Sequence, residues 1–336
     1  MKKICIVRLL GIVMLIIFAA GSLSGCTGKN KSGNGSGDPS ARPQATALPD
    51  VSPLLWRVTD NVGHTLYLFG TIHVGDGRNN AVLERVAPIL DSCDALAVEF
   101  DIIAYSKNTQ QMMQDMMQYV LADGSEVSEH MPAELYQRSY DLLERAKVFP
   151  SLFTRYNLAW WAQLVESAVL TVYTDLDSEK AMDSLLIRHA NKKGMPVLDV
   201  ESSSFQMALL NSFEDELYLM LIEDQLDNTE GLNSQLHELY DLWLSGDKDT
   251  FWTYLAGDED VDAAEGQYTE AQIAMIEDYN RKLLDDRNLG MRDRAIEFLT
   301  GGQTVFFAVG AAHMANETGL VKLLTDAGYT VEEVSY

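Results

Sequence analysis

Two copies of the pattern Gly-x-x-His lie near opposite ends of the chain and are its clearest chemical signal. The first occupies residues 70–73 and ends in His73, and the second occupies residues 310–313 and ends in His313. Each follows a short apolar run that reads as a buried strand, and a glycine at the end of a strand lets the backbone turn. The histidine can then point into the crevice beyond the strands, where open α/β sheets bind ligands. We therefore expect one site built from both ends of the chain.

Two carboxylates extend this pattern. The apolar run 95–98 is followed by Glu99, and the apolar run 196–200 is followed by Glu201. If all four runs are neighbouring parallel strands, the four polar side chains meet at one edge of the sheet. The alternative is that each polar residue ends its own strand with its hydrogen bonds satisfied locally. Four such residues in equivalent positions favour a metal or catalytic centre.

Two histidines with one or two carboxylates suit a divalent metal ion that keeps an open coordination position. Such an ion acidifies a bound water, which attacks a carbonyl or phosphoryl centre. The chain lacks the H-E-x-x-H pattern, so the ligands would come from separate strands. Mixed nitrogen and oxygen donors could hold zinc, manganese or cobalt. Glu201 is a candidate catalytic residue, and its two possible roles, general base or fourth ligand, stay open at this point.

The same residues belong to longer segments that resemble the TraB/GumN family, which includes the animal Tiki proteins described as metal-dependent membrane-associated proteases. The matching segments, in the family's order and spacing, are LFGTIHVGD (68–76), VEFD (98–101), VES (200–202) with Gln206, DRN (286–288) with Met291, and AVGAAH (308–313). Together they extend over residues 54–336. The resemblance implies manganese or cobalt in preference to zinc, with His73, Glu99 and His313 as the metal ligands.

Arg287 and Asn288 match an Arg-Asn pair of the family and are further candidate catalytic residues. The guanidinium of Arg287 could hold a substrate carboxylate or stabilise an oxyanion, because its donors fit paired oxygens. An equally weighted alternative is a structural ion pair with Asp285, Asp286 or Glu99.

The amino-terminal residues indicate export and lipid attachment. Residues 1–25 read as a lipoprotein signal peptide, because a basic start is followed by the apolar run 9–20, and LSGC (23–26) matches a lipoprotein cleavage box ending at Cys26. The apolar run is too short to span a bilayer comfortably, since spanning takes about 20 residues. An uncleaved anchor is the alternative, and it also leaves the folded part outside the cytoplasm. We expect an extracytoplasmic protein, lipid-anchored to the cell membrane through Cys26.

Residues 26–53 read as the lipidated cysteine and a flexible linker, because they lack apolar periodicity and are rich in Gly, Ser, Asn, Pro and Ala. The formal net charge of −25 argues against nucleic acid as a partner and against electrostatic docking on anionic lipid. Attachment is therefore expected to come from the lipid itself. Cys5 would leave with the signal peptide, so Cys93 remains single and reads as a small core residue.

Residues 54–336 are expected to form one TraB/GumN-like domain of the α/β (α+β) class, with a central mixed sheet built from both ends of the chain. A hairpin is predicted at its start, with turn residues at 60–63. The expected strands are 54–58, 65–70, 95–98, 196–200, 304–313 and 330–334, and the expected helices outside the middle of the chain are 80–90 and 317–327. The long helical middle is expected to be an insertion that caps the site.

Several polar or sulfur-containing features receive ordinary structural interpretations. The stripe formed by Met112, Met113, Met116 and Met117 could be a ligand surface, but packing within the cap is the favoured reading. The acidic segment 257–260 lacks the oxygen spacing of a calcium-binding loop and reads as a solvated turn. No ligand role is expected for the remaining histidines, which are His64, His130, His189 and His237.

Three functions are compatible with the sequence. The first is a metal-dependent hydrolase of peptides or related amides. The second is a non-catalytic lipoprotein that binds a peptide or small ligand, because members of the family are implicated in peptide-pheromone control. The third follows from a distant similarity of this fold class to haem-binding and erythromycin-esterase-like proteins, in which the same histidines would face haem or act as a metal-free acid and base.

Overall fold

The computed structural model describes residues 51–256 and 268–334. The expected signal peptide, Cys26, all of the linker before residue 51 and the acidic segment 257–260 lie outside the described residues. At the start of the described residues, Val51 is buried and the Ser52 N–H donates to the Leu244 carbonyl. No helix of the described ranges is both long enough and apolar enough to cross a membrane.

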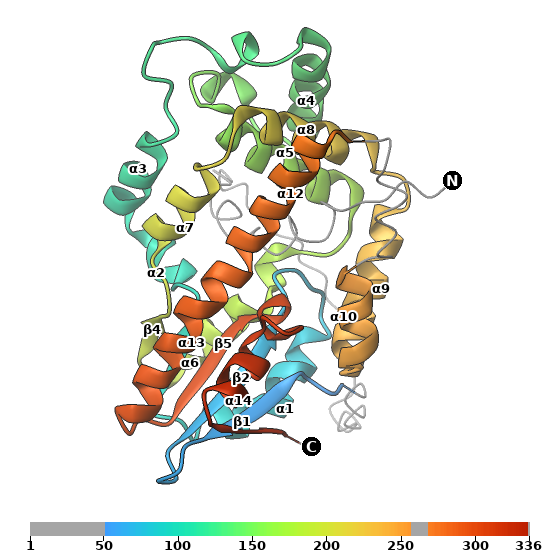
Figure 1. Cartoon of the computed structure of the whole chain (residues 1–336). Helices are drawn as coiled ribbons and strands as arrows, with labels where there is room; N and C mark the ends of the chain where they lie inside the picture. Colours follow the sequence, from blue (N-terminus) through green and yellow to red (C-terminus); the bar gives the residue numbers. More distant parts are fainter. Residues whose placement is uncertain (1–50, 257–267, 335–336) are drawn as a thin grey trace, which may run out of the picture.

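Six strands form one mixed sheet in the order β4-β3-β5-β2-β1-β6 (Figure 1). Their bounds are β1 Leu55–Thr59, β2 Thr65–Thr71, β3 Ala95–Val98, β4 Val197–Asp199, β5 Val305–Gly310 and β6 Thr330–Glu333. β4, β3, β5 and β2 are parallel neighbours, whereas β1 is antiparallel to both β2 and β6. The predicted mixed sheet from both ends of the chain is therefore confirmed.

The two central strands, β2 and β5, come from opposite ends of the chain. Phe69 pairs with Ala308, and Thr71 pairs with Gly310. All six residues of β5 are buried, as expected for a parallel strand that is covered on both faces. This explains why the strand reads as a continuous apolar run without alternation.

The predicted hairpin joins β1 to β2. One oxygen of the Asp60 side chain accepts hydrogen bonds from the Val62 and His64 N–H groups, and Gly63 has a φ of 96°, which favours glycine. His64 lies at this turn, is partly exposed, and pairs with Asp60 through Nδ1.

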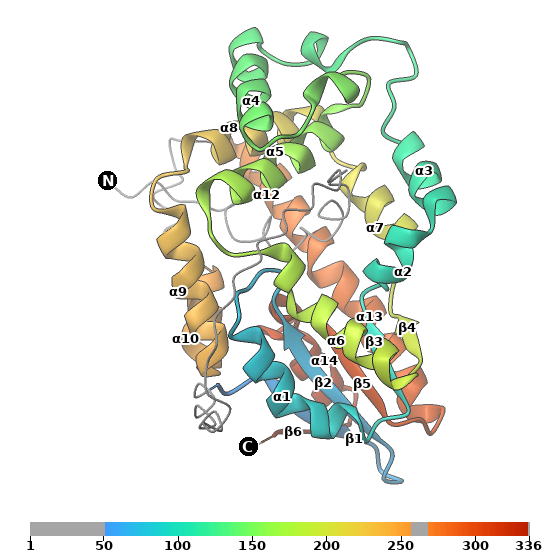
Figure 2. The ribbon, with the colours of Figure 1, turned by 180° about the vertical axis from the view of Figure 1, so that it is seen from behind.

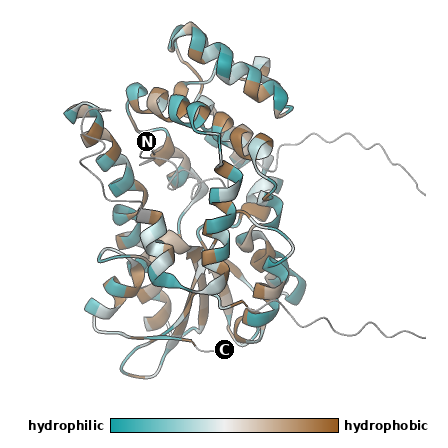
Figure 3. Ribbon diagram, turned by 90° about the vertical axis from the view of Figure 1, so that its right-hand side faces the viewer, coloured by the Kyte–Doolittle hydropathy of each residue, from teal (hydrophilic) through white to brown (hydrophobic). Residues whose placement is uncertain are grey.

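Helices cover both faces of the sheet. Figures 1 and 2 show α1 and α6 on one face and α13 and α14 on the other. Their bounds are α1 Asn79–Leu90, α6 Met182–Lys193, α13 Asp285–Thr300 and α14 Leu320–Asp326. Hydrophobic residues gather on the enclosed strands, which Figure 3 shows in brown at the centre of this layered body.

The helical middle of the chain forms a cap beyond the carboxyl ends of the parallel strands (Figure 1). Its longer helices are α2 Ile102–Lys107, α3 Thr109–Met117, α4 Ala133–Arg145, α5 Leu158–Tyr173, α7 Ser203–Leu210, α8 Asp215–Asp227, α9 Leu232–Ser245, α10 Lys248–Ala256 and α12 Glu270–Leu283. α5 lies at the centre, where Trp160 and Trp161 are fully buried. The side chain of Asn157 caps α5 by accepting from the Trp160 N–H. The predicted helical insertion is therefore confirmed.

The methionine stripe on α3 divides into two rows. Met112 and Met116 pack against the hydrophobic core, whereas Met113 and Met117 are 61% and 63% exposed. Neighbouring helix positions point about 100° apart, so packing one row turns the other outward. The expected packing role holds for the first row only.

Cys93 is a free, buried thiol, as the sequence indicated. Its Sγ lies 3.3 Å from the Ile89 carbonyl oxygen and donates to it. Burial raises the pKa of this thiol to about 12, so Cys93 is a core residue without nucleophilic character at neutral pH.

Candidate active site

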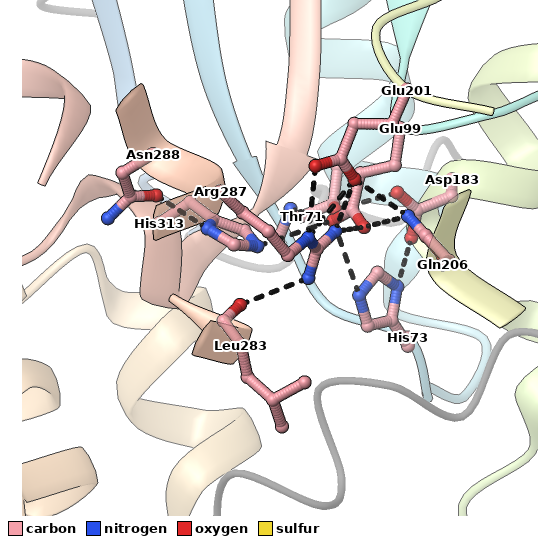
Figure 4. Close-up of polar contacts among 11 residues, drawn as sticks. Thr71, His73, Glu99, Asp183, Glu201, Gln206, Leu283, Arg287, Asn288 and His313 are labelled. Atoms are coloured by element: carbon pink, nitrogen blue, oxygen red, sulfur yellow. Dashed lines mark hydrogen bonds and ion pairs between the residues drawn. The ribbon is translucent and has the colours of Figure 1, made fainter. Parts of the chain in front are cut away.

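The four polar residues singled out in the sequence lie together at one edge of the sheet (Figure 4). The parallel strands that precede them are adjacent, with β3 pairing with both β4 and β5, and β5 pairing with β2. The expected convergence of His73, Glu99, Glu201 and His313 is therefore confirmed. What the four groups do chemically depends on their contacts.

The two histidines face one carboxylate oxygen. His73 Nε2 and His313 Nε2 each lie 3.9 Å from Glu99 Oε1. The side chains are buried, with exposed fractions of 4% for His73, 3% for Glu99 and 0% for His313. Neither Nε2 atom has a hydrogen-bond partner among the described residues. Two imidazole nitrogens thus lie near the same carboxylate oxygen, and the three residues follow three different strands.

The other ring nitrogen of each histidine is held by an oxygen. His73 Nδ1 lies 2.8 Å from Asp183 Oδ2, and Thr71 Oγ1 donates to the second Asp183 oxygen at 2.7 Å. His313 Nδ1 lies 2.6 Å from Asn288 Oδ1, while Asn288 Nδ2 donates to the Thr318 carbonyl.

These contacts determine where the imidazole lone pairs point. Because the Asn288 amide uses its nitrogen on a carbonyl, its oxygen must accept from His313 Nδ1, which leaves the lone pair of His313 on Nε2. The Asp183 carboxylate likewise accepts from His73 Nδ1. Both histidines therefore direct Nε2 towards Glu99, and the hydrogen bonds at Nδ1 fix their orientation.

The charges at the site differ between the two histidines. Burial, together with the nearby charge of Arg287, lowers the pKa of His313 to about 3, so this imidazole is neutral. Burial also lowers the pKa of His73, but the charge and hydrogen bond of Asp183 outweigh burial and raise it above its usual value. Burial raises the pKa of Glu99, yet its neighbours, above all the charge of Arg287, lower it overall and keep the carboxylate ionised.

The glycines of the two Gly-x-x-His patterns have a role other than the predicted one. Neither has a positive φ, and the φ of Gly310 is −48°, so the expected turning role was wrong. A Cβ on Gly310 would lie 3.3 Å from both Glu99 Oε1 and His73 Nε2, and a Cβ on Gly70 would lie 3.1 Å from Ala311 Cα. The Gly310 N–H donates to Glu99 Oε1 at 2.9 Å. These glycines therefore allow the two halves of the site to approach closely.

Arg287 joins the two carboxylates. Its Nη2 atom lies 2.6 Å from Glu99 Oε2 and 2.7 Å from Glu201 Oε2, and its Nε donates to both Glu201 oxygens. The ion pair with Glu99 is one of the alternatives drawn from the sequence, and Glu201 is an additional partner. Of the acidic neighbours considered for Arg287, Asp286 pairs instead with Arg281. Gln206 Nε2 also bridges Glu99 and Glu201, at 3.1 and 3.0 Å.

Sequence reasoning assigned no role to Asp183 and Thr71. Asp183 lies in the first turn of α6, where an acidic residue is ordinary because it complements the helix dipole. The Met182 N–H donates to the Ile72 carbonyl, which fixes the start of α6 beside the His73 loop. No local pattern marks this contact, since the fold alone brings α6 to His73.

Three other histidines form their hydrogen bonds outside the candidate site. His130 contacts Ser125, His189 contacts Asp91, and His237 contacts Asp175. Their expected lack of a ligand role stays a prediction.

The kinds of donor atom at this site suit a metal ion, but the distances between these atoms are too long for one. Within residues 51–256 and 268–334, no three His, Cys, Asp or Glu side chains are close enough to hold an ion as placed. Ligand atoms at 2.0–2.2 Å from a tetrahedral ion lie about 3.4 Å apart. The two 3.9 Å separations would have to shorten by about half an ångström for both histidines and Glu99 to bind one ion. The unpartnered Nε2 atoms and the ionised carboxylate are donors of the kind that such an ion binds.

Comparison with known proteins gives one family. A sequence model of the TraB/PrgY/gumN family matches residues 54–333. The chain is 25% identical over 262 residues to the uncharacterized protein YbaP of Escherichia coli strain K12, and equally to that of Shigella flexneri, covering 77% of this chain and 87% of YbaP. No solved structure matches the chain significantly.

Proposed function

We propose that this chain, which belongs to the TraB/PrgY/gumN family, is a membrane-tethered, extracytoplasmic, metal-dependent hydrolase of peptides or related amides. His73, Glu99 and His313 would hold the metal ion. Manganese or cobalt is favoured by the resemblance to Tiki proteins, and zinc fits the same mixed donors.

One observation carries the proposal. His73 Nε2 and His313 Nε2 are buried, have no partner among the described residues, and face the same ionised oxygen of Glu99. Buried polar atoms are rarely left unbonded, and both histidines have their other ring nitrogen already bonded. A cation between them removes this cost.

The neighbouring side chains support this assignment. Metal-binding histidines commonly donate their second ring N–H to a carboxylate or carbonyl oxygen. Asp183 and Asn288 supply such acceptors for His73 and His313. A metal bound here would acidify its water and polarise a substrate carbonyl. Arg287, fixed by Glu99 and Glu201, holds both carboxylates in place. Glu201 would serve either as the general base or as a fourth ligand.

A metal-free acid–base hydrolase is the second candidate. The 2.8 Å contact between Asp183 and His73 and the 3.9 Å spacing around Glu99 Oε1 favour it. In this mechanism, His73 would transfer the proton, with Asp183 fixing its orientation.

Location rests on the sequence of the first 26 residues. A basic start, an apolar run and a cysteine at the cleavage box support lipid attachment at Cys26. The partners would be the membrane, through this lipid, and a peptide or small-molecule ligand.

Metal analysis separates the two mechanisms. We would dialyse the purified full chain against chelator, load it with manganese, cobalt or zinc, and measure bound metal and peptide cleavage. One ion per chain with metal-dependent cleavage is expected. Loss of both in His73→Ala but not in the surface control His189→Ala would support the proposal. Cleavage by chelated protein would favour the metal-free mechanism, and no binding of any of the three ions would contradict the metal centre.

A further inference from the structure

A second polar site lies inside the cap, lined mainly by residues of α5, α8 and α12. Figure 1 shows where these three helices lie in the cap. It is a small, partly open cavity of about 30 Å³. Its polar lining comes from Glu166 and Gln163 on α5, Tyr218 and Gln225 on α8, and Tyr279 on α12. None of the metal-site residues lines it, so it is separate from the site at the sheet edge.

Two buried acceptors of the cavity have no partner. Glu166 Oε1 and Gln225 Oε1 are buried and have no hydrogen-bond partner among the described residues. Of the donors nearby, the Gln163 amide contacts Tyr119 and Ala159, and the Tyr218 hydroxyl donates to the Leu210 carbonyl. A group that enters this cavity with hydrogen-bond donors would satisfy both acceptors.

The cavity also lacks a positive charge. Among the described residues, no Lys, Arg or His side chain lines it, and the titratable lining groups are Glu166, Tyr218 and Tyr279. Burial alone raises the pKa of Glu166 to about 8. A buried carboxylate without a cation is costly, so Glu166 is mainly protonated at neutral pH until a cation enters.

The volume limits what can enter. About 30 Å³ accommodates a group the size of one or two water molecules. A primary ammonium group is of that size and carries three donors, and aromatic rings in the lining favour a cation. The rest of such a ligand would extend through the open side.

We propose that this cavity binds the primary ammonium group of a ligand, with Glu166 and Gln225 as its acceptors. The ammonium could belong to a small amine or to the amino terminus of a peptide. The cavity lies near the sheet-edge site along the chain. Tyr279, which lines the cavity, and Arg287, which belongs to the sheet-edge site, are eight residues apart on the nearly continuous helices α12 and α13, a rise of about 12 Å. That span equals three or four extended peptide residues. Binding of a peptide's amino terminus in this cavity rests on the proposed function, whereas binding of an ammonium group as such does not.

The first test uses methylammonium chloride on the purified full chain without added metal. We expect a saturable rise in Tm beyond that in equal potassium chloride, with release of nearly one proton per ion bound at pH 7. The same response is expected from Glu223→Gln, an exposed position on α8, and from His73→Ala. Glu166→Gln, which is isosteric and should fold, should lose it. No response beyond potassium chloride, or an equal response in Glu166→Gln, would overturn the proposal and leave water as the occupant.

The second test identifies the source of the ammonium. Binding of an apolar pentapeptide with a free amino terminus is compared with binding of its N-acetylated form, again without metal. Binding at least tenfold tighter for the free peptide, lost in Glu166→Gln, would support an amino-terminal anchor. Equal binding of the two peptides, together with methylammonium binding, would support a site for small amines. Because neither test uses metal, failure of the metal centre would leave both results interpretable.

Discussion

Asp183 Oδ2 lies 2.8 Å from His73 Nδ1, and the other oxygen of the same carboxylate accepts from Thr71. The equivalent contact of His313 is with the neutral amide of Asn288. The two histidines are therefore oriented by partners of different charge. Removing one partner should weaken the centre by a different amount from removing the other, because a carboxylate makes an imidazole a stronger donor to metal.

We predict that Asp183→Ala lowers manganese affinity by 10–100-fold, since His73 loses the group that fixes its orientation. Asp183→Asn keeps an acceptor at this position and should recover part of the loss. Calorimetric titration with manganese would measure both, and Asp326→Ala, at a surface ion pair, is the control. An affinity of Asp183→Ala equal to that of the control would show that Asp183 does not position His73.

Gly310→Ala should damage the centre without disrupting the fold. The φ of −48° suits alanine, but the added Cβ would lie 3.3 Å from Glu99 Oε1 and His73 Nε2. These atoms must shift by a few tenths of an ångström, so we expect at least a tenfold loss of metal affinity with a small change in Tm. Gly77→Ala is the matched control, because no atom lies within 4 Å of its added Cβ. Unchanged affinity in Gly310→Ala would argue against ligation at this point.

The arrangement of the sheet could be predicted because it depends on local pattern. The strand that ends before His313 is buried throughout, and the one that ends before His73 is buried from Leu68 onwards, so both read as mainly apolar runs. Polar residues directly after such runs lie at the strand ends whatever the rest of the fold does. Parallel pairing then brings them together, as β2 and β5 show.

Contacts that depend on tertiary packing could not be predicted. Asp183 reads as an ordinary first-turn residue until α6 is placed beside the His73 loop. Glu166 reads as a polar position on an apolar helix, and only the packing of α8 and α12 against α5 buries it. The role of Gly310 likewise depends on side chains from two other strands.

The two ends of the chain should be energetically coupled through the metal. We predict that His73→Ala and His313→Ala each abolish stoichiometric metal binding, and that the double variant loses no more metal-dependent stabilisation than either single variant. Ligands of one centre act as a unit, so their losses are not additive. A double-mutant cycle tests this. The free energy of unfolding is measured with and without saturating manganese for the unmodified protein, the two single variants and the double variant. Additive losses would show that the histidines act independently.

Cys26→Ser is predicted to block lipid attachment, because Cys26 is the cysteine at the cleavage box. Labelling with a fatty-acid analogue and fractionation of membranes would measure the change. Cys93→Ser serves as the control, since Cys93 is buried in the folded domain. Equal labelling of Cys26→Ser and the unmodified chain would place the anchor elsewhere.

The final prediction concerns stability and pH. Burial raises the pKa of Glu166 from 4.5 to about 8. Between these values the unfolded chain releases the Glu166 proton while the folded protein retains it, so ionisation favours the unfolded state and stability falls as pH rises. Glu166→Gln has no such proton. We expect the variant and the unmodified protein to differ little near pH 4.5, and the variant to gain at least about 1 kcal/mol in relative stability by pH 8, or roughly 2 °C in Tm. Thermal unfolding from pH 4.5 to 9 measures this difference, with Glu223→Gln expected to track the unmodified protein. A difference independent of pH would mean that Glu166 is ionised in the folded cap, paired with a cation at all these pH values.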